Sequence, residues 1–487
     1  MKLKNRIIAV GLLVIAVLTL HGCSFAGISD NDLLQPPKAT GEKAEIQNLL
    51  ETTTKGDYML KYPQSGDYRS AIVMNNIDND SNDEAIAFYK TSKDNSSINI
   101  IFMKKVKDKW ETIGSYSNAN SDVDRVYFGD VDNDGSKEVI VGWSSYLTGS
   151  NQVTMYNYSN DVVGETIVNS DTTYMDMAMF DITNDGTDDL VVLTRAVDEI
   201  TGETNATARL YSCCLDGKFT KVSEIKTNPN IISYSQILQG NVNEGIKGLF
   251  IDGNTANQNE MVTEVLYYSN EKQILISPLS SNLSDNVTLR NTSTVCKDVN
   301  EDGIIEVPSP YTPVVASQDF SPCPTTIWYK VNGQNDVTSV LQTVANYSDG
   351  FYFVLPESWY ENIVATNNNT TRTTSFYEII NIIEEPTEVA TKASTDENVV
   401  PEVSTDAITE SETSEEKIVE TSSEPVLILK VFSEKDWKNE SATKSAEGYI
   451  VLAEESGLVY TCKLGKGVDS KIDLSTEQVT ENFKLIK

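Results

Sequence analysis

The chain has 487 residues, of which 72 are Asp or Glu, 38 are Lys or Arg and one is histidine, so its formal net charge is −34 at pH 7. Such acidity argues against nucleic acid and anionic lipid as partners, because phosphate groups are bound by basic clusters. The only histidine, His21, lies in the N-terminal segment that is predicted below to be removed, and without imidazole the chain cannot assemble the familiar serine, cysteine or zinc hydrolase centres, whereas carboxylate-only chemistry, as in glycosidases, stays open.

The first residues predict export. Three basic residues precede an apolar run at 7–20, which is too short to span a bilayer comfortably. Residues 20–23, Leu-His-Gly-Cys, resemble the lipobox of bacterial lipoproteins. The resemblance implies a signal peptide over 1–22, removal of the histidine with it, and lipid attachment at Cys23; a plain secretory signal with an incidental cysteine is the alternative. We expect an extracytoplasmic protein, lipid-anchored to the bacterial cell membrane, with residues 23–41 as a spacer.

A short helical lead-in is predicted over 42–64. Its first residues, 42–50, place the apolar Ile46, Leu49 and Leu50 on one helical face. This pattern indicates packing against the domain that follows, rather than a functional role.

Four acidic loops follow at nearly even intervals, starting at residues 76, 130, 181 and 298. In each, oxygen-bearing side chains stand at loop positions 1, 3 and 5, position 7 can offer a backbone carbonyl, and position 9 is a carboxylate. A hard cation that takes six to eight oxygen ligands, calcium above all, suits this pattern. The candidate metal ligands are Asn76, Asp78, Asp80 and Glu84; Asp130, Asp132, Asp134 and Glu138; Asp181, Thr183, Asp185 and Asp189; and Asp298, Asn300, Asp302 and Glu306.

The spacing of the loops indicates a repeat. The last gap is about twice the others, and a degenerate copy lies midway at 240–245, Gly-Asn-Val-Asn-Glu-Gly, without acids at positions 5 and 9. We interpret it as a repeat that has lost its metal site and kept its paired strands.

Each repeat carries the same run of β-type segments. In the second repeat they are 126–128, 139–143, 153–158 and 162–167, rich in β-branched and aromatic residues and separated by turn residues. Four strands in about 50 residues form a unit of propeller-blade size, and such a period is typical of a propeller or a solenoid.

These loops and strands resemble the FG-GAP/VCBS repeats of the integrin α-subunit head and of many bacterial surface proteins, over residues 65–345. The resemblance implies an all-β fold, a β-propeller of about 5–7 four-stranded blades, in which each acidic loop joins the first two strands of a blade. It implies the same sixteen side chains as ligands of about four structural Ca²⁺ ions. Two departures weaken individual loops, because Ser81 replaces the usual glycine and Thr183 is a weaker ligand than Asp or Asn.

Two other interpretations of the loops are possible. An EF-hand or dockerin needs a bidentate acid at position 12 and a flanking helix, but position 12 is Ala87, Val141, Val192 or Ser309 and β-type segments follow the loops. Alternatively, the loops are Asn/Asp-rich hairpin turns without metal.

Cysteine gives less information. Besides Cys23 there are Cys213, Cys214, Cys296, Cys323 and Cys462, an odd number, so at least one has no partner within this set. Cys296 and Cys323 flank one repeat and either form a disulfide or are buried thiols.

Residues 346–487 predict a small α+β domain without acidic loops. Strands are expected at 351–355, 426–432, 449–453 and 459–462, and Ser475 with Gln478 forms a capping box for a last helix. Residues 384–424, with thirteen acids against two lysines, are predicted to be a disordered acidic insertion.

The pattern favours a lipid-anchored, calcium-binding β-propeller that acts as a binding or interaction module, with a surface protein or a cell-wall polymer as partner. No catalytic residue is assigned, since pairs such as Asp198 with Glu199 or Glu434 with Asp436 resemble any acidic surface. The alternatives are an accessory subunit or carboxylate-based enzyme acting on glycans, and a purely structural surface spacer.

Overall fold

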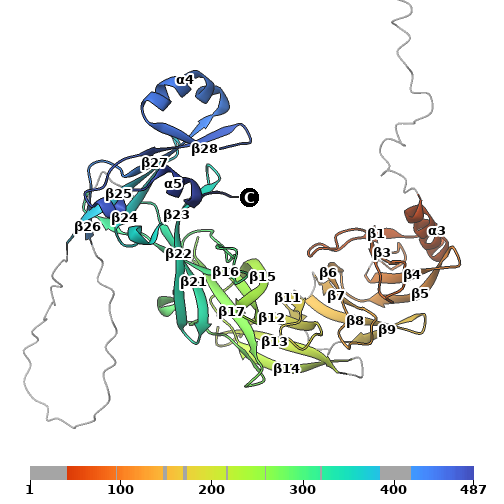
Figure 1. Ribbon diagram of the computed structural model, residues 1–487. Coiled ribbons are helices and arrows are strands. Elements are labelled where there is room, and N and C mark those ends of the chain that lie inside the picture. Colours follow the sequence, from red (N-terminus) through yellow and green to blue (C-terminus); the bar gives the residue numbers. More distant parts are fainter. Residues whose placement is uncertain are drawn as a thin grey trace, which may run out of the picture. The chain divides into compact units, whose positions relative to one another are not determined.

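A computed structural model of the chain describes residues 41–94, 96–145, 151–167, 173–214, 218–257, 259–317, 321–383 and 418–486. The chain divides into two compact units, one up to Thr173 and one from Tyr174 onward (Figure 1). The lipobox and Cys23 lie outside the described residues, as do residues 384–417 of the predicted acidic insertion.

The first unit opens with the predicted helix, which ends at a left-handed residue, Lys55. Its apolar face buries Ile46 and Leu50 against the first sheet, where β2 leads through the first acidic loop into β3. The elements are α3 (Glu42–Thr54), β1 (Met59–Lys61), β2 (Ile72–Asn75), β3 (Glu84–Lys90), β4 (Ile98–Val106) and β5 (Lys109–Asn118), with the strand order β1-β3-β4-β5 and β2 also paired to β3.

The second sheet is an antiparallel meander whose strands cover the four segments predicted for the second repeat. Trp143 is fully buried and donates a hydrogen bond to Thr154 Oγ1 at 3.0 Å, so it is a core residue. The strands are β6 (Asp122–Gly129), β7 (Glu138–Ser144), β8 (Asn151–Ser159) and β9 (Val162–Ile167), with the short β10 (Thr173–Tyr174) also in this sheet.

The second unit begins with two more four-stranded antiparallel meanders, whose facing side chains form one apolar cluster. The degenerate repeat is a β15–β16 hairpin, so its strand pairing is retained, as predicted. The strands are β11 (Asp176–Phe180), β12 (Asp189–Val197), β13 (Thr204–Cys214) and β14 (Lys218–Lys226) in one sheet, and β15 (Ser233–Asn243), β16 (Ile246–Asn254), β17 (Met261–Ser269) and β18 (Ile274–Ile276) in the next, followed by η1 (Leu283–Asp285).

The fifth sheet extends across the predicted boundary at residue 345. Strand β23 pairs with β22 and, on its other side, with β30 at the end of the chain, so residues assigned to the C-terminal domain complete a blade-like sheet. Its strands are β19 (Val307–Tyr311), β21 (Thr325–Gly333), β22 (Asp336–Asn346), β23 (Phe351–Val354) and β30 (Phe483–Leu485).

The remaining C-terminal elements are a seven-stranded sheet with helices, in agreement with the predicted α+β part. The capping box is confirmed, because Ser475 and Gln478 each accept the other's backbone N–H. Strand β26 lies inside the predicted disordered insertion. The prediction therefore extended the insertion too far at its C-terminal end. The elements are β20 (Val314–Val315), η2 (Glu357–Trp359), β24 (Ile363–Asn368), β25 (Thr373–Ile383), β26 (Ile418–Thr421), β27 (Leu427–Ser433), α4 (Glu434–Ala446), β28 (Tyr449–Glu455), β29 (Leu458–Leu464), η3 (Ser470–Ile472) and α5 (Thr476–Asn482).

The predicted fold class is confirmed. The described part of the chain is predominantly β, with five successive antiparallel sheets of propeller-blade type followed by an α+β region. None of its helices is both long and apolar enough to cross a bilayer.

Candidate metal centres

The acidic loops lie where the repeat pattern places them. The first three connect the first two strands of their sheets, β2 to β3, β6 to β7 and β11 to β12. The fourth loop stands directly before β19, and a bridge between Lys297 and Glu306 closes it. Because strands follow every loop, the EF-hand interpretation is wrong.

The loops share one backbone conformation. Position 4 is left-handed in all of them, with φ of 59° at Asn79, 59° at Asn133, 60° at Asn184 and 63° at Glu301. Position 6 also has a positive φ in the three loops that carry glycine there, at residues 135, 186 and 303, a conformation that glycine adopts at no steric cost. Ser81 of the first loop lacks it, so that turn differs as the sequence suggested.

Backbone N–H groups orient the carboxylates, as the second loop illustrates. Asp130 accepts hydrogen bonds from the N–H of Asp134 at 3.1 Å and of Gly135 at 3.0 Å. Glu138 Oε2 accepts from the N–H of Val131 at 3.1 Å. The same position 2 to position 9 bond recurs from Ile77 to Glu84 and from Val299 to Glu306. The local pattern therefore turns acids two to eight residues apart toward one another.

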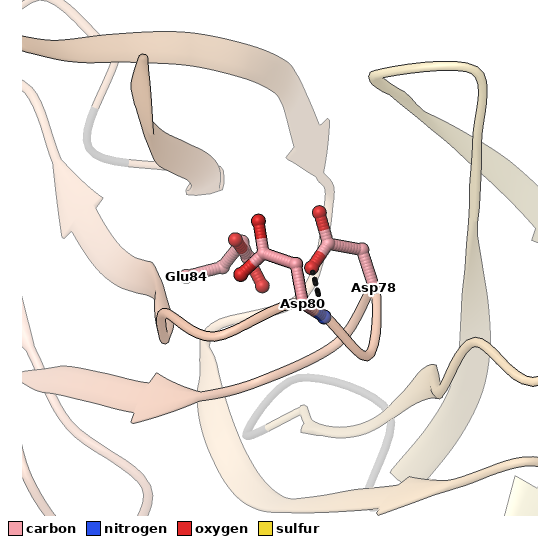
Figure 2. Close-up of side chains that lie close together, drawn as sticks. All are labelled: Asp78, Asp80 and Glu84. Carbon is pink, nitrogen blue, oxygen red and sulfur yellow. Dashed lines mark hydrogen bonds between the residues drawn. The ribbon is translucent and has the colours of Figure 1, made fainter. Parts of the chain in front are cut away.

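In the first two loops, this places three carboxylates within reach of one ion. Figure 2 shows the carboxylates of Asp78, Asp80 and Glu84 close together. One oxygen from each of the three lies within 4.8 Å of the others, and the same is true of Asp130, Asp132 and Glu138. Each pair of like charges at such distances repels by a kcal/mol or more at a surface-like dielectric. Within the described residues such carboxylate triads occur only in these two loops; position 3 of the third and fourth loops is Thr183 and Asn300, which are not acids.

Burial and mutual repulsion raise the pKa values of the acids at position 9. Burial, with repulsion from Asp132, raises the pKa of Glu138 to about 8 despite the Val131 N–H. The same causes raise the pKa of Glu84 to about 6 and that of Glu306 to about 7. Of the three, Glu138 therefore resists ionisation at neutral pH most strongly.

Unpartnered buried oxygens test whether a cation fits. Oε1 of Glu84, Oε1 of Glu306 and Oδ1 of Asn76 are buried and accept no hydrogen bond, a situation that costs about 1–3 kcal/mol for each unsatisfied group. All these donors are oxygen, the ligand type that calcium prefers. The residues therefore fit a calcium ion, which would convert unpartnered, mutually repelling oxygens into ligands.

Two loops already contain a lysine ammonium. Lys104 on β4 forms a very short hydrogen bond with Asp78 and lies 3.5 Å from Asp80 Oδ2. Burial opposes its charge, but the bonds to Asp78 and Tyr158 outweigh burial and raise the pKa of Lys104. In the third loop, Lys247 Nζ lies 2.9 Å from Asp181 Oδ2.

In the third loop, hydroxyl groups also donate hydrogen bonds to the carboxylate at position 9. Thr183 Oγ1 donates to Asp189 Oδ2 at 2.9 Å, and Ser212 on β13 donates to the other oxygen of Asp189. Asp is one methylene shorter than Glu, and Asp189 accordingly bonds the N–H of position 3 instead of position 2. Both of its carboxylate oxygens thus have partners, whereas Oε1 of Glu84 and Oε1 of Glu306 have none.

The second and fourth loops lack such a cation. Among the ion pairs of the described residues, none includes a carboxylate of these two loops. The four loops, similar in sequence, therefore differ in electrostatic state, and Asp130–Glu138 has the greatest uncompensated charge.

The degenerate repeat contacts the fourth loop. Asn241 donates to Gly303 O at 2.9 Å and accepts from the N–H of Ile305 at 2.9 Å. A Cβ on Gly240 would lie 2.4 Å from Ile305 Cγ1, so glycine is required there for close approach. This hairpin supports its neighbour without a metal cage of its own.

Sequence reasoning missed a buried ion pair in the fourth sheet. Arg290 Nη2 lies 2.6 Å from Asp252 Oδ1, and both side chains are fully buried. Thr263 Oγ1 and the N–H of Cys296 also donate to Asp252. Cys296 and Cys323 are free thiols, the first buried and the second half-buried, so they do not form the disulfide that was one alternative.

Comparisons with known proteins add little. No family model and no curated protein matches the chain. Among solved structures, a protein from Lactobacillus plantarum is 10% identical, with 66% of this chain and 91% of that chain covered and a TM-score of 0.28. The exotype rhamnogalacturonan lyase YesX is 9% identical, with 66% and 72% covered and a TM-score of 0.27. The Dos1 propeller is 10% identical, with 61% and 70% covered and a TM-score of 0.27.

Likenesses at these scores carry no argument about substrate or partner. The sheets and loops themselves define the class: a protein built of successive blade-type β-sheets that presents acidic, oxygen-lined loops at the start of its sheets.

Proposed function

We propose that this protein is an extracytoplasmic, lipid-anchored binding module whose blade-type sheets are stabilised by calcium in their acidic loops. The second loop carries the proposal, because Asp130, Asp132 and Glu138 bring three carboxylate oxygens within 4.8 Å of one another and no ion pair of the described residues compensates them. The unpartnered Glu306 Oε1 supports the same role for the fourth loop.

The calcium has a structural role in this proposal. The loops connect strands whose side chains form the sheet cores, so an ion in a loop fixes the ends of two strands at once. With dissociation constants of about 0.1–1 mM, the weak range typical of extracellular modules, millimolar calcium would contribute about 0.4–1.4 kcal/mol of stability per site by mass action.

The membrane anchor rests on the sequence 20–23 and the proposed acylation of Cys23. The partner is proposed to be a surface protein or a cell-wall polymer, since the net charge of −34 disfavours nucleic acid. No enzymatic activity is proposed: Asp198 accepts two backbone N–H groups of its own turn, and Glu434 pairs with Lys438 on an exposed helix.

Retention of purified cell-wall polymer and of surface-protein extract by the immobilised full chain tests this function. We expect one of the two to be retained in millimolar calcium and released by chelator, and the Asp132→Asn variant to release it at a lower chelator concentration. Retention that is equal with calcium and with chelator, in both the native chain and the variant, would contradict a calcium-stabilised binding module.

A further inference from the structure

The first acidic loop contains an ammonium group in a built pocket. Lys104 Nζ contacts Asp78, lies 3.5 Å from both Asp80 Oδ2 and Asp161 Oδ1, and donates to Tyr158 Oη at 3.1 Å. The side chain of Lys104 is 13% exposed and that of Asp78 is 5% exposed. The Tyr158 ring centroid lies 5.3 Å from the ammonium, which adds a cation–π attraction.

The register of the sheets shows which position supplies this group. In each sheet, the residue directly after loop position 9 pairs with a residue on a neighbouring strand. The residue one position further along that neighbouring strand is Lys104 for the first loop, Asn157 for the second, Ser212 for the third and Lys330 for the fourth. The pairs are Ala85 with Met103, Val139 with Tyr156, Leu190 with Tyr211, and Val307 with Tyr329.

The chemistry of this one position differs between loops. Ser212 donates to Asp189 in the third loop, and the neutral Asn157 stands beside the second loop. Lys330 has the register of Lys104, yet no ion pair within 4 Å joins it to a described carboxylate. Only Lys104 is also held by a tyrosine and an aspartate of the next sheet, Tyr158 and Asp161.

We propose that Lys104 is the resident cation of the first loop and takes the place of calcium there. The ammonium bonds the carboxylates of positions 3 and 5, which calcium would need as ligands, and a divalent ion beside it would meet strong repulsion at this distance. The inference rests on the proposed function, because it separates the first loop, where a lysine pairs with the carboxylates of positions 3 and 5, from the second and fourth loops, which are proposed to need the metal.

Lys104 contacts only some of the oxygen atoms of the first loop. Glu84 Oε1 and Asn76 Oδ1 remain buried without a partner, so the oxygen ligands stay in place behind the lysine. Removing the ammonium should therefore convert the first loop into a calcium site of the same kind as Asp130–Glu138.

Calorimetric titration of the full chain with Ca²⁺ tests the proposal through two matched position-3 variants. Asp132→Asn is expected to remove one bound ion, whereas Asp78→Asn is expected to remove none. Loss of one ion in Asp78→Asn would overturn the assignment of Lys104. An unchanged count in Asp132→Asn would instead contradict the proposed function, so the two failures are distinguishable.

The complementary variant is Lys104→Met, for which we expect one additional ion, bound at least about tenfold more tightly than any ion in the native first loop. Lys105→Met is the control, since it removes the same charge one residue away, where Lys105 pairs with Glu42 at 3.1 Å; it should leave the count unchanged. If Lys104→Met folds only in calcium, the proposal is supported; an unchanged count in the folded variant would overturn it. If Lys104→Met does not fold at all, the Asp78→Asn titration still decides.

Discussion

The second acidic loop and the buried ion pair of the fourth sheet both contain carboxylates whose negative charge must be balanced. They differ in whether the protein itself supplies the positive charge. Asp252 lies fully buried, with Arg290 at 2.6 Å and further hydrogen-bond donors around it. One oxygen from each of Asp130, Asp132 and Glu138 lies within 4.8 Å of the others, but no protein cation compensates them within the described residues. This difference supports the proposal that the loop takes an external cation, whereas the sheet supplies its own.

The largest expected effect on stability comes from breaking the buried ion pair between Arg290 and Asp252. Arg290→Met should lower the free energy of unfolding by about 3–5 kcal/mol, because it leaves the Asp252 carboxylate buried and unpaired. Chemical denaturation should show the same loss in calcium and in chelator. A loss that disappears in calcium would mean that the two regions are not independent.

Removal of calcium should have the next largest effect. With two or three loops occupied, chelator should lower the free energy of unfolding of the full chain by about 1–4 kcal/mol. Thermal unfolding with and without chelator measures this difference. Glu244→Gln, in the exposed turn of the degenerate repeat, is the matched control and should show the native response to chelator.

A substitution that disturbs the backbone conformation shared by the loops should have a smaller effect on stability. Gly135 has φ of 92° and open space where a Cβ would lie, so Gly135→Ala should cost about 1–2 kcal/mol through backbone conformation alone. Gly333→Ala, also with open space but without a positive φ, should change stability by less than about 0.5 kcal/mol. Equal effects would show that loop conformation is not the constraint.

The smallest effect is a pH dependence of the calcium contribution. The pKa of Glu138 is about 8 in the calcium-free fold against an ordinary value of 4.5, so the fold binds this proton more tightly than the unfolded chain does. Calcium-free stability should therefore fall as pH rises from about 5 to 8. Calcium must displace the proton, so its contribution should be small near pH 6 and complete above about pH 8, a change of at most about 1 kcal/mol per loop.

Glu138→Gln should flatten this calcium-dependent part of the profile. Glu264 is the control, because burial raises its pKa to about 7 outside the loops; Glu264→Gln should alter the pH profile equally with and without calcium. A calcium contribution that is the same at pH 6 and pH 8 would contradict the role assigned to Glu138.

Local features were predictable from the sequence, and distant pairings were not. The loops, the strands around Val139–Trp143 and the capping box at Ser475 depend on residues within about ten positions of one another, so spacing alone revealed them. The pairing of β23 with β30 joins residues more than 130 positions apart, and nothing near Phe351 indicates it. For this reason the sequence did not indicate that one sheet extends across the predicted boundary at residue 345.

The dependence on distant residues also explains why the sequence did not reveal the side chains that pair with the loop carboxylates. All four show the same acids at almost the same spacing, yet Lys104 lies 26 positions from Asp78, and Ser212 lies 23 positions from Asp189. A search of the third strand of each repeat for lysine would have found Lys104, but it would also have found Lys330, which forms no such pair. Only the structure distinguishes them.

Anomalous diffraction from crystals of the full chain grown in millimolar calcium tests the central claim most directly. The account predicts a calcium peak in the second loop, within about 2.3–2.6 Å of oxygens from Asp130, Asp132, Asp134 and Glu138, and no peak beside Lys104. A second loop without calcium under these conditions would contradict the claim that its uncompensated carboxylates require a metal ion.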